Sequence, residues 1–358
     1  MTGVQTCALP IFLSLMAKNG LDCVIMKDIP TIRYLSGFRG DSSLLYVDAK
    51  STVLITDGRY TTQAEGEVQH YCRVFTYNGD IWQAAADFAK AHTKIGFDGA
   101  AYSYNDYMSL KEAVSGKELL NIDLKYLRMV KDERELNLMW KAFKIADQAF
   151  LKLLPEIKPG MTEKALAARL EYYMSSMGSE KPSFDTIIAS GARSALPHGM
   201  ASDKQIEIGD FITFDFGAVY DGYHSDMTRT VVLGMANSWH KEIYTIVEEA
   251  QWRGLKSAKP GMTGAELDAI VREYITSRGY GENYVHGLGH GVGLEIHEMP
   301  NINKRGTDVV LEPGMTFSIE PGIYIPGKGG VRIEDTVVLT DDGAKVLCGV
   351  KKQLMEIV

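Results

Sequence analysis

Apolar runs of strand length alternate with amphipathic stretches of helical period in the first third of the chain. Four apolar runs have the length and the turn-forming boundaries of buried strands. They are residues 21–26, 43–49, 51–57 and 93–99. Two stretches with helical spacing lie between them, at residues 60–68 and 81–92. This alternation predicts a small α/β domain over residues 12–125, in which no set of catalytic side chains stands out.

The pattern changes near residue 131, where a long amphipathic segment begins. Asp132 and Glu135 have the spacing of a capping box at a helix N-terminus. Apolar residues follow at helical spacing, at Leu136, Met139, Trp140 and Phe143. We therefore place a domain boundary between residues 122 and 131, and a second domain over residues 126–358.

The second domain contains an internal repeat. The segment KPGMTEKALAARLEYYMSSMG, which begins at Lys158, recurs as KPGMTGAELDAIVREYITSRG, which begins at Lys259. In each copy a threonine precedes an amphipathic stretch and a glycine ends it, so each copy predicts a Thr-capped helix. The repeat predicts two similar halves within one α+β domain.

The likeness extends to the strands after each helix, where acidic residues recur. Residues 209–217 align with residues 314–322, which places Asp215 against Glu320. A turn and a second acidic strand follow in each half, and that strand begins at Asp226 in one half and at Glu334 in the other. Scattered surface acids have no reason to recur in this way. We therefore interpret the four carboxylates as one site that the halves share.

Each acidic pair has the spacing of a β-hairpin. The midpoint between Asp215 and Asp226 lies beside Gly222, and the midpoint of the second pair is Gly327. We therefore expect the members of each pair to be cross-strand neighbours. Four converging carboxylates repel one another and raise one another's pKa unless cations compensate, and two divalent ions would balance them.

A glycine-rich segment, VHGLGHGVGLEIHE, supplies histidines to this site. It carries His286, His290 and His297 within twelve residues, among four glycines that permit close backbone approach. A lone histidine is more often structural than a ligand, but three in such a segment reverse that preference. We expect the remaining metal ligand to be one of these histidines.

Composition and charge restrict the partners. The 358 residues carry a net charge of -8, the pI is near 5.6, and no run of basic residues is present. This balance disfavours a nucleic-acid or anionic-membrane partner and favours a small neutral or cationic ligand. No stretch approaches the roughly 20 apolar residues that span a bilayer. Apart from Cys7, the three cysteines have no metal or disulfide spacing, which suits a cytoplasmic protein.

Residues 1–11, MTGVQTCALPI, are interpreted as non-native. Read as codons that begin with GTG, they resemble the translation of a short-read sequencing adapter. A signal peptide is the alternative, but the segment lacks a basic start and an obvious cleavage site. On this hypothesis the native N-terminus is missing or replaced. A clone made from source DNA that encodes these residues in frame would reject it.

The acidic and histidine motifs together resemble the dinuclear site of the pita-bread metallopeptidases. The five matching positions are Asp215, Asp226, His290, Glu320 and Glu334, in DFG, SDMTRT, GHGVGLEIHE, SIEPG and VRIED. More narrowly, the chain is similar to the aminopeptidase P and Xaa-Pro dipeptidase (prolidase) group, because IRYLSGFRGDSSLL and LITDGRY resemble its creatinase-type N-terminal domain. The resemblance covers residues 12–358. It implies a pita-bread catalytic domain with a pseudo-twofold repeat, preceded by that smaller α/β domain.

The resemblance also implies two divalent ions and assigns their ligands. Asp215 chelates one ion, Asp226 and Glu334 bridge both, and His290 with Glu320 completes the other. This mostly oxygen set favours Mn²⁺, with Co²⁺, Fe²⁺ or Zn²⁺ as alternatives. In the family the ions provide the attacking hydroxide, and Glu320 is also the proton shuttle.

Three further residues carry over from the resemblance, and two more are candidates. His297 resembles the histidine that binds the substrate carbonyl, His198 the one that lines the proline-side pocket, and Arg332 the arginine that fixes carboxylates at the site. Phe184 is a candidate wall of the proline pocket, and His286 is a candidate substrate contact. The resemblance implies peptide substrates with proline at position 2, and a homodimer.

Two activities remain open within this group. Some prolidases have an arginine after the proline of the HExP segment, where this chain has Asn301. This departure favours an aminopeptidase P that acts on longer peptides, and the alternative is a dipeptidase that acts only on Xaa-Pro dipeptides. The intact ligand positions disfavour both a non-catalytic peptide-binding relative and a metal-free creatinase-like hydrolase.

Overall fold

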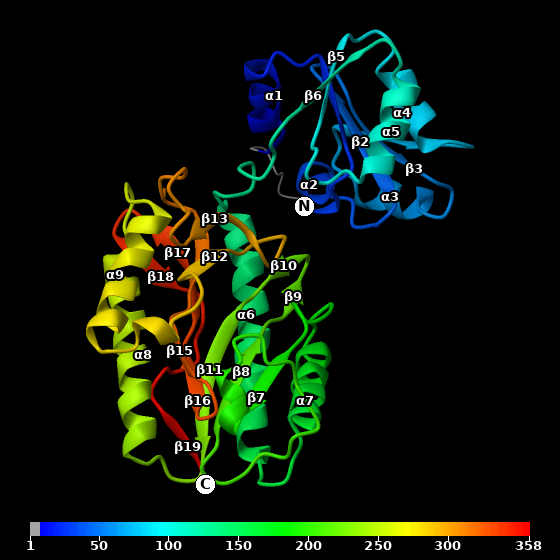
Figure 1. The fold of residues 1–358 in the computed structure, drawn as a ribbon. Coiled ribbons are helices and arrows are strands. Elements are labelled where there is room, and N and C mark those ends of the chain that lie inside the picture. Colours follow the sequence, from blue (N-terminus) through cyan, green and yellow to red (C-terminus); the bar gives the residue numbers. More distant parts are fainter. Residues whose placement is uncertain (1–7) are drawn as a thin grey trace. The chain divides into compact units, whose positions relative to one another are not determined.

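The computed structural model describes residues 8–358 and divides the chain into two compact units, Met1–Leu127 and Arg128–Val358 (Figure 1). Of the eleven residues interpreted as non-native, 1–7 lie outside the described residues, and 8–11 begin helix α1. Across residues 8–358, no helix has the length and apolar character needed to cross a bilayer.

The first unit is built around a mixed six-stranded sheet in the order β4-β3-β2-β1-β5-β6. Its strands are β1 Cys23–Met26, β2 Ser43–Asp48, β3 Thr52–Thr56, β4 Cys72–Thr76, β5 Lys94–Phe97 and β6 Glu118–Asn121. Its helices are α1 Ala8–Lys18, α2 Ile29–Ser36, α3 Thr61–Glu67, α4 Ile81–Phe88 and α5 Tyr104–Ala113. The four predicted strands and two predicted helices are present, and the α/β class is confirmed.

The second unit consists of two halves, each with a pair of helices packed on a sheet (Figure 1). The first half contains α6 Glu133–Leu153, η1 Leu154–Glu156, α7 Glu163–Ser176, β7 Ile187–Ser190, η2 Gly191–Ala195, β8 Phe211–Phe216, β9 Val219–Tyr220, β10 Tyr223–His224 and β11 Met227–Leu233. The second half contains α8 Ser238–Ser257, α9 Gly264–Ser277, η3 Gly281–Asn283, β12 Gly289–Gly291, β13 Glu298–Ile302, β14 Thr316–Ile319, β15 Gly322–Ile325, β16 Gly329–Arg332, β17 Asp335–Thr340 and β18 Gly343–Val346. The strand β19, Met355–Ile357, then joins β11 of the first half in parallel.

The two halves have separate hydrophobic cores. One core packs α6 and α7 against β8 and β11. The other packs α8 and α9 against β14 and β17. The predicted α+β class with an internal repeat is confirmed. Two sheets that each bury one face against helices leave their remaining surfaces to meet in the middle of the unit.

The repeated helices begin and end as their shared sequence predicts. Thr162 accepts a hydrogen bond from the backbone of Ala165 at the start of α7, and Thr263 does the same for Glu266 at the start of α9. Gly178 and Gly279, which follow these helices, have φ angles of 102° and 88°, a conformation that glycine adopts without strain. The capping box predicted from Asp132 is also present at the start of α6.

Each half contributes one long hairpin to the middle of the unit. In the first hairpin β8 pairs with β11 and β9 pairs with β10, in one continuous register that turns at Asp221 and Gly222. In the second, β14 pairs with β17 and β15 pairs with β16, again in one register, around the turn at Gly327. The hairpins therefore carry both acidic pairs toward the same region.

The expectation that the members of each acidic pair are cross-strand neighbours is confirmed for the second pair and wrong for the first. Glu320 and Glu334 are opposite each other, because their positions fall between the paired residues of β14–β17 and β15–β16. Asp215, however, pairs with Thr228, and Asp226 lies two residues nearer the turn. The prediction for the first pair is wrong because the turn is centred one residue later than the midpoint of the two aspartates.

Candidate active site

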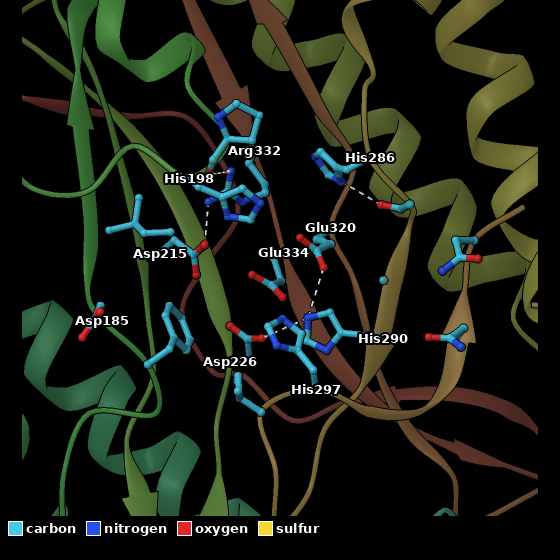
Figure 2. Close-up of a pocket in the computed structure, with 18 of the residues that line it drawn as sticks. Asp185, His198, Asp215, Asp226, His286, His290, His297, Glu320, Arg332 and Glu334 are labelled. Atoms are coloured by element: carbon cyan, nitrogen blue, oxygen red, sulfur yellow. Dashed lines mark hydrogen bonds and ion pairs between the residues drawn. The ribbon is translucent and has the colours of Figure 1, made fainter. Parts of the chain in front are cut away.

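A cavity of about 510 Å³ lies in the second unit, between residues from both halves (Figure 2). One part of its lining is apolar, and the rest is dense in ionisable groups. The apolar part consists of Phe184, Ile187, Pro197, Met200 and Ile296. All ten candidate site residues from the sequence line this cavity: Phe184, His198, Asp215, Asp226, His286, His290, His297, Glu320, Arg332 and Glu334.

Asp226, His290 and Glu334 form the centre of the polar cluster. One possible ligand atom from each lies within 4.8 Å of those of the other two. The Nε2 atom of His290 is 3.5 Å from Asp226 Oδ2 and 3.4 Å from Glu320 Oε1. Figure 2 shows these side chains pointing toward one another from different segments of the second unit. The spacing suits a divalent cation, which draws carboxylates and an imidazole into one coordination sphere.

Glycines let the histidine strand enter this cluster. A Cβ atom added at Gly289 would lie 2.0 Å from the Ser318 carbonyl oxygen, and one at Gly291 would lie 2.2 Å from the Met299 carbonyl oxygen. Only glycine permits such close packing of β12 against its neighbours on both sides. His290, between these two glycines, is thereby held at the level of the carboxylates.

Arg332 fixes Asp215 at the edge of the cluster. Its Nη2 donates to Asp215 Oδ2 at 2.6 Å, and its Nη1 donates to the Tyr324 hydroxyl at 2.8 Å. Its Nε donates to Thr228 Oγ1 at 3.0 Å, and that hydroxyl donates to Glu334 Oε2 at 2.7 Å. One buried guanidinium therefore orients, directly or through a hydroxyl, a carboxylate from each hairpin.

Burial and crowding disfavour the ionised carboxylates. Burial and the charges of Glu334 and Asp215 raise the pKa of Asp226 well above its usual value. Burial and the charges of Glu320 and Asp215 do the same to the pKa of Glu334, and burial raises the pKa of Glu320 to about 7. Burial also lowers the pKa of His290, so its imidazole is neutral at pH 7. Added positive charge at this site would stabilise the ionised carboxylates.

The oxygen atoms of the cluster also suit a bound cation. Asp215 Oδ1 and Glu334 Oε1 are buried and have no hydrogen-bond partner among residues 8–358. Unpaired buried oxygens are costly, and a bound cation satisfies them. With oxygens and one neutral imidazole as donors, the site suits a hard or borderline divalent ion.

The other histidines differ in their roles. His286 is engaged within the protein, because its Nε2 is 2.8 Å from the Tyr324 hydroxyl and its Nδ1 is 2.7 Å from the Gly287 carbonyl oxygen. Burial and the charge of Arg332 lower the pKa of His286 to about 4, which keeps it neutral. His198 and His297 are exposed at the cavity, and the His297 ring packs edge-on against His290 at 4.3 Å between centroids.

Sequence reasoning missed Thr228 and Tyr324. Both hydroxyls contact Arg332, and neither has a signal in its local sequence beyond a place on a predicted strand. Thr228 lies directly opposite Asp215, so a correct hairpin register identifies it. Tyr324 is on β15, and its link to His286 depends on an element 38 residues away.

Comparison with known proteins identifies both units. Residues 137–341 match the description "Metallopeptidase family M24", and residues 11–130 match "Creatinase/Prolidase N-terminal domain". The Xaa-Pro dipeptidase of Pyrococcus furiosus is 44% identical over 95% of this chain and 97% of its own length.

Two solved structures extend this comparison. An Xaa-Pro dipeptidase from Bacillus anthracis has a TM-score of 0.94 and 42% identity, and the match covers 98% of this chain and 99% of that one. An X-Pro aminopeptidase from Thermotoga maritima has a TM-score of 0.89 and 40% identity, over 96% of this chain and 100% of that one.

Proposed function

This chain belongs to metallopeptidase family M24, and from that premise we propose that it is a metal-dependent Xaa-Pro dipeptidase. The observation that carries the metal-dependent part is the convergence of Asp226, His290 and Glu334 in one cavity. The Xaa-Pro part is supported by the similar proteins that bear this name. The proposed ligand set is Asp215, Asp226, His290, Glu320 and Glu334, with Mn²⁺ as the first choice of ion.

The choice of a dipeptidase replaces the preference for an aminopeptidase P that was based on the sequence. Asn301 favoured an aminopeptidase P, because a neutral amide there leaves the far end of the substrate unbound. Asn301 does lie across the β12–β13 pair from His290 and lines the cavity. The relatives named Xaa-Pro dipeptidase favour the alternative instead. Aminopeptidase P remains the second candidate, supported by Asn301 and by the similar Thermotoga maritima structure.

Bound divalent ions would supply Lewis acidity toward the scissile carbonyl and a water of lowered pKa. The protein's part is to hold their ligands in place, and Arg332 does this for Asp215 while Thr228 does it for Glu334. Glu320 has one oxygen bound to the Ser318 hydroxyl at 3.1 Å. Its carboxyl group lines the cavity and suits proton transfer to the prolyl nitrogen as the C–N bond breaks.

The exposed histidines and the apolar wall suit the substrate. The ring N–H groups of His198 and His297 can donate to the substrate carbonyl, where negative charge develops during attack. The pyrrolidine ring of proline matches the apolar surface formed by Phe184 and its neighbours. An Xaa-Pro bond has no N–H, so the site requires no acceptor for it.

The first experiment uses chelator-stripped protein with Ala-Pro, Ala-Pro-Gly and Ala-Ala, each with and without Mn²⁺. We expect Mn²⁺-dependent release of alanine from Ala-Pro and none from Ala-Ala. Cleavage of Ala-Pro-Gly with similar efficiency would favour the second candidate. If neither proline peptide is cleaved while the metal is bound, the Xaa-Pro assignment is wrong.

A pair of acid-to-amide variants tests the ligand assignment. Asp215→Asn should lose most activity and weaken Mn²⁺ binding, because the amide keeps the shape but not the charge of the ligand. Asp203→Asn is the matched control, since Asp203 is an exposed carboxylate that pairs with Lys164. Wild-type turnover with full metal content in Asp215→Asn would overturn the assignment. The predicted homodimer is checked on the same samples by light scattering.

A further inference from the structure

The two hairpins meet along a seam, which we define as residues 228–230 of the first half and residues 332–336 of the second. The Glu334 N–H donates to the Thr228 carbonyl at 3.1 Å, and the Thr230 hydroxyl donates to the Arg332 carbonyl at 2.9 Å. The Thr336 hydroxyl donates to the Asp226 carbonyl at 3.0 Å. The main chain at Asp226 and at Glu334 is therefore held by contacts from the opposite half.

Arg229 reinforces the seam from the side away from the cavity. Alternation along β11 directs Thr228 toward Glu334, while Arg229 points into the protein and is fully buried. Its Nη1 donates to the carbonyl oxygens of both Thr228 and Glu334. Its Nη2 donates to Asp335 Oδ1 at 2.7 Å and to the Val350 carbonyl at 2.8 Å.

Asp335 compensates this buried charge and extends the network. Its Oδ2 accepts from Gln251 Nε2 on α8 at 2.9 Å and from Lys352 Nζ at 2.6 Å. Lys352 also donates to Gln251 Oε1 at 3.1 Å. A buried ion pair of this kind is geometrically specific, because loss of Asp335 removes the carboxylate that contacts the buried Arg229 guanidinium. The network joins β11, the start of β17, α8 and the segment 350–352.

We propose that Arg229 and Asp335 are positioning residues for the metal centre, and that they tie its geometry to the segment 350–352. Neither side chain lines the cavity, so they act through the main chain of Glu334. Groups behind metal ligands typically change metal affinity by about 10- to 100-fold when they are altered. The inference rests on the proposed function only in that Asp226 and Glu334 hold the ions.

The test separates positioning from simple stabilisation. Arg229→Lys keeps the positive charge but cannot span Glu334, Asp335 and Val350 at once. We expect Mn²⁺ titration calorimetry on stripped protein to show at least one ion bound about tenfold more weakly. Leu170→Ala, on the buried face of α7, is the matched control: its Tm falls through lost packing while its Mn²⁺ affinity stays at the wild-type value.

Lys352→Met provides an independent variant if Arg229→Lys does not fold. It keeps the length of the side chain and removes the ammonium group that donates to Asp335 and Gln251, so we expect Mn²⁺ to bind at least threefold more weakly. Wild-type affinity in the folded Arg229 or Lys352 variant, or an equal loss in Leu170→Ala, would overturn the proposal. Calorimetry does not use a peptide, so wild-type protein that binds Mn²⁺ but leaves Ala-Pro intact rejects the proposed function alone. Wild-type protein that binds no Mn²⁺ rejects both.

Discussion

The two hairpins share a topology but distribute their polar groups differently. In the second hairpin Glu320 is opposite Glu334, whereas in the first the residue opposite Asp215 is Thr228. The next position toward the turn on the same face holds Asp226 in the first hairpin and Arg332 in the second.

The equivalent pairs are therefore Thr228 with Glu334 and Asp226 with Arg332. Symmetry of the fold brings the positions together, but it does not give the two halves equal charge. Three acids and the His290 imidazole surround the centre, while the fourth acid, Asp215, is paired with the arginine. Two bound ions would therefore have different ligand environments, although the two halves share one fold.

The largest effect is expected where the hairpins differ most, at Glu334 and its counterpart Thr228. Glu334→Gln should lower kcat/KM by about 10²- to 10³-fold, because it removes a ligand charge worth several kcal/mol. Thr228→Ser keeps the hydroxyl that Glu334 accepts from and should stay within about threefold of wild type. Steady-state kinetics on Ala-Pro with Mn²⁺ measures both. Equal losses of kcat/KM in Glu334→Gln and Thr228→Ser would contradict the proposed difference between the two hairpins.

A smaller effect is expected at Arg332, the counterpart of Asp226. Arg332→Lys keeps the charge but cannot reach Asp215, Tyr324 and Thr228 together, so kcat/KM should fall about 10- to 100-fold. Metal content by atomic absorption and kinetics on the same sample are the measurements. Exposed Arg253 on α8, which pairs with Glu249, provides the control Arg253→Lys. Wild-type kcat/KM and metal content in Arg332→Lys would show that the arginine does not position the ligands.

The smallest effect is a pH dependence of stability in the stripped protein. Carboxyl groups with a raised folded-state pKa favour folding at low pH, and that contribution is lost as pH rises through the folded-state value. Histidines with a lowered folded-state pKa act in the opposite direction, because the unfolded chain still binds their protons near pH 6.5 and releases them as the pH rises. Between pH 6.5 and 8.5, Glu320, with its pKa of about 7, should alone cost about 1 kcal/mol.

Urea titration at the two pH values measures this loss, and Mn²⁺-saturated protein is the control because the bound charge compensates the carboxylates. Both hairpins supply acids with raised pKa, so Asp226→Asn and Glu320→Gln should each reduce the slope. The same change in stability between pH 6.5 and 8.5 in the wild type, Asp226→Asn and Glu320→Gln would contradict the electrostatic description of the site.

Local signals predicted three of the four α-helices of the second unit, and α8 was not among the predicted elements. Thr162, Thr263 and Asp132 cap their helices as their spacing indicates, because a cap depends on residues within one turn. In the first unit, α5 was missed although Ser103 and Asp106 form a capping box that the sequence contains. The N-terminal ends of helices can thus be predicted from residues within one turn, and this signal was present for α5 as well.

The register of the first hairpin and the network around Arg332 were beyond that reasoning. A midpoint rule assumes that two acids face each other, and the positive φ of Asp221, 45°, centres the turn one residue later. Tyr324 and Thr228 reach Arg332 from strands that only the folded sheets bring together. The grouping of the candidate residues, by contrast, followed from the repeat and the resemblance.

The contact between Arg229 and Val350 spans 121 residues, and β19 pairs with β11 over a similar separation. During translation, β11 therefore leaves the ribosome long before the segment that completes its surroundings. During that interval the nascent chain has an unpaired strand edge and an arginine that lacks its final partners. The chain would then become able to bind metal only late in its synthesis. Nascent chains near the ribosome would therefore not be exposed to peptidase activity from an incomplete copy.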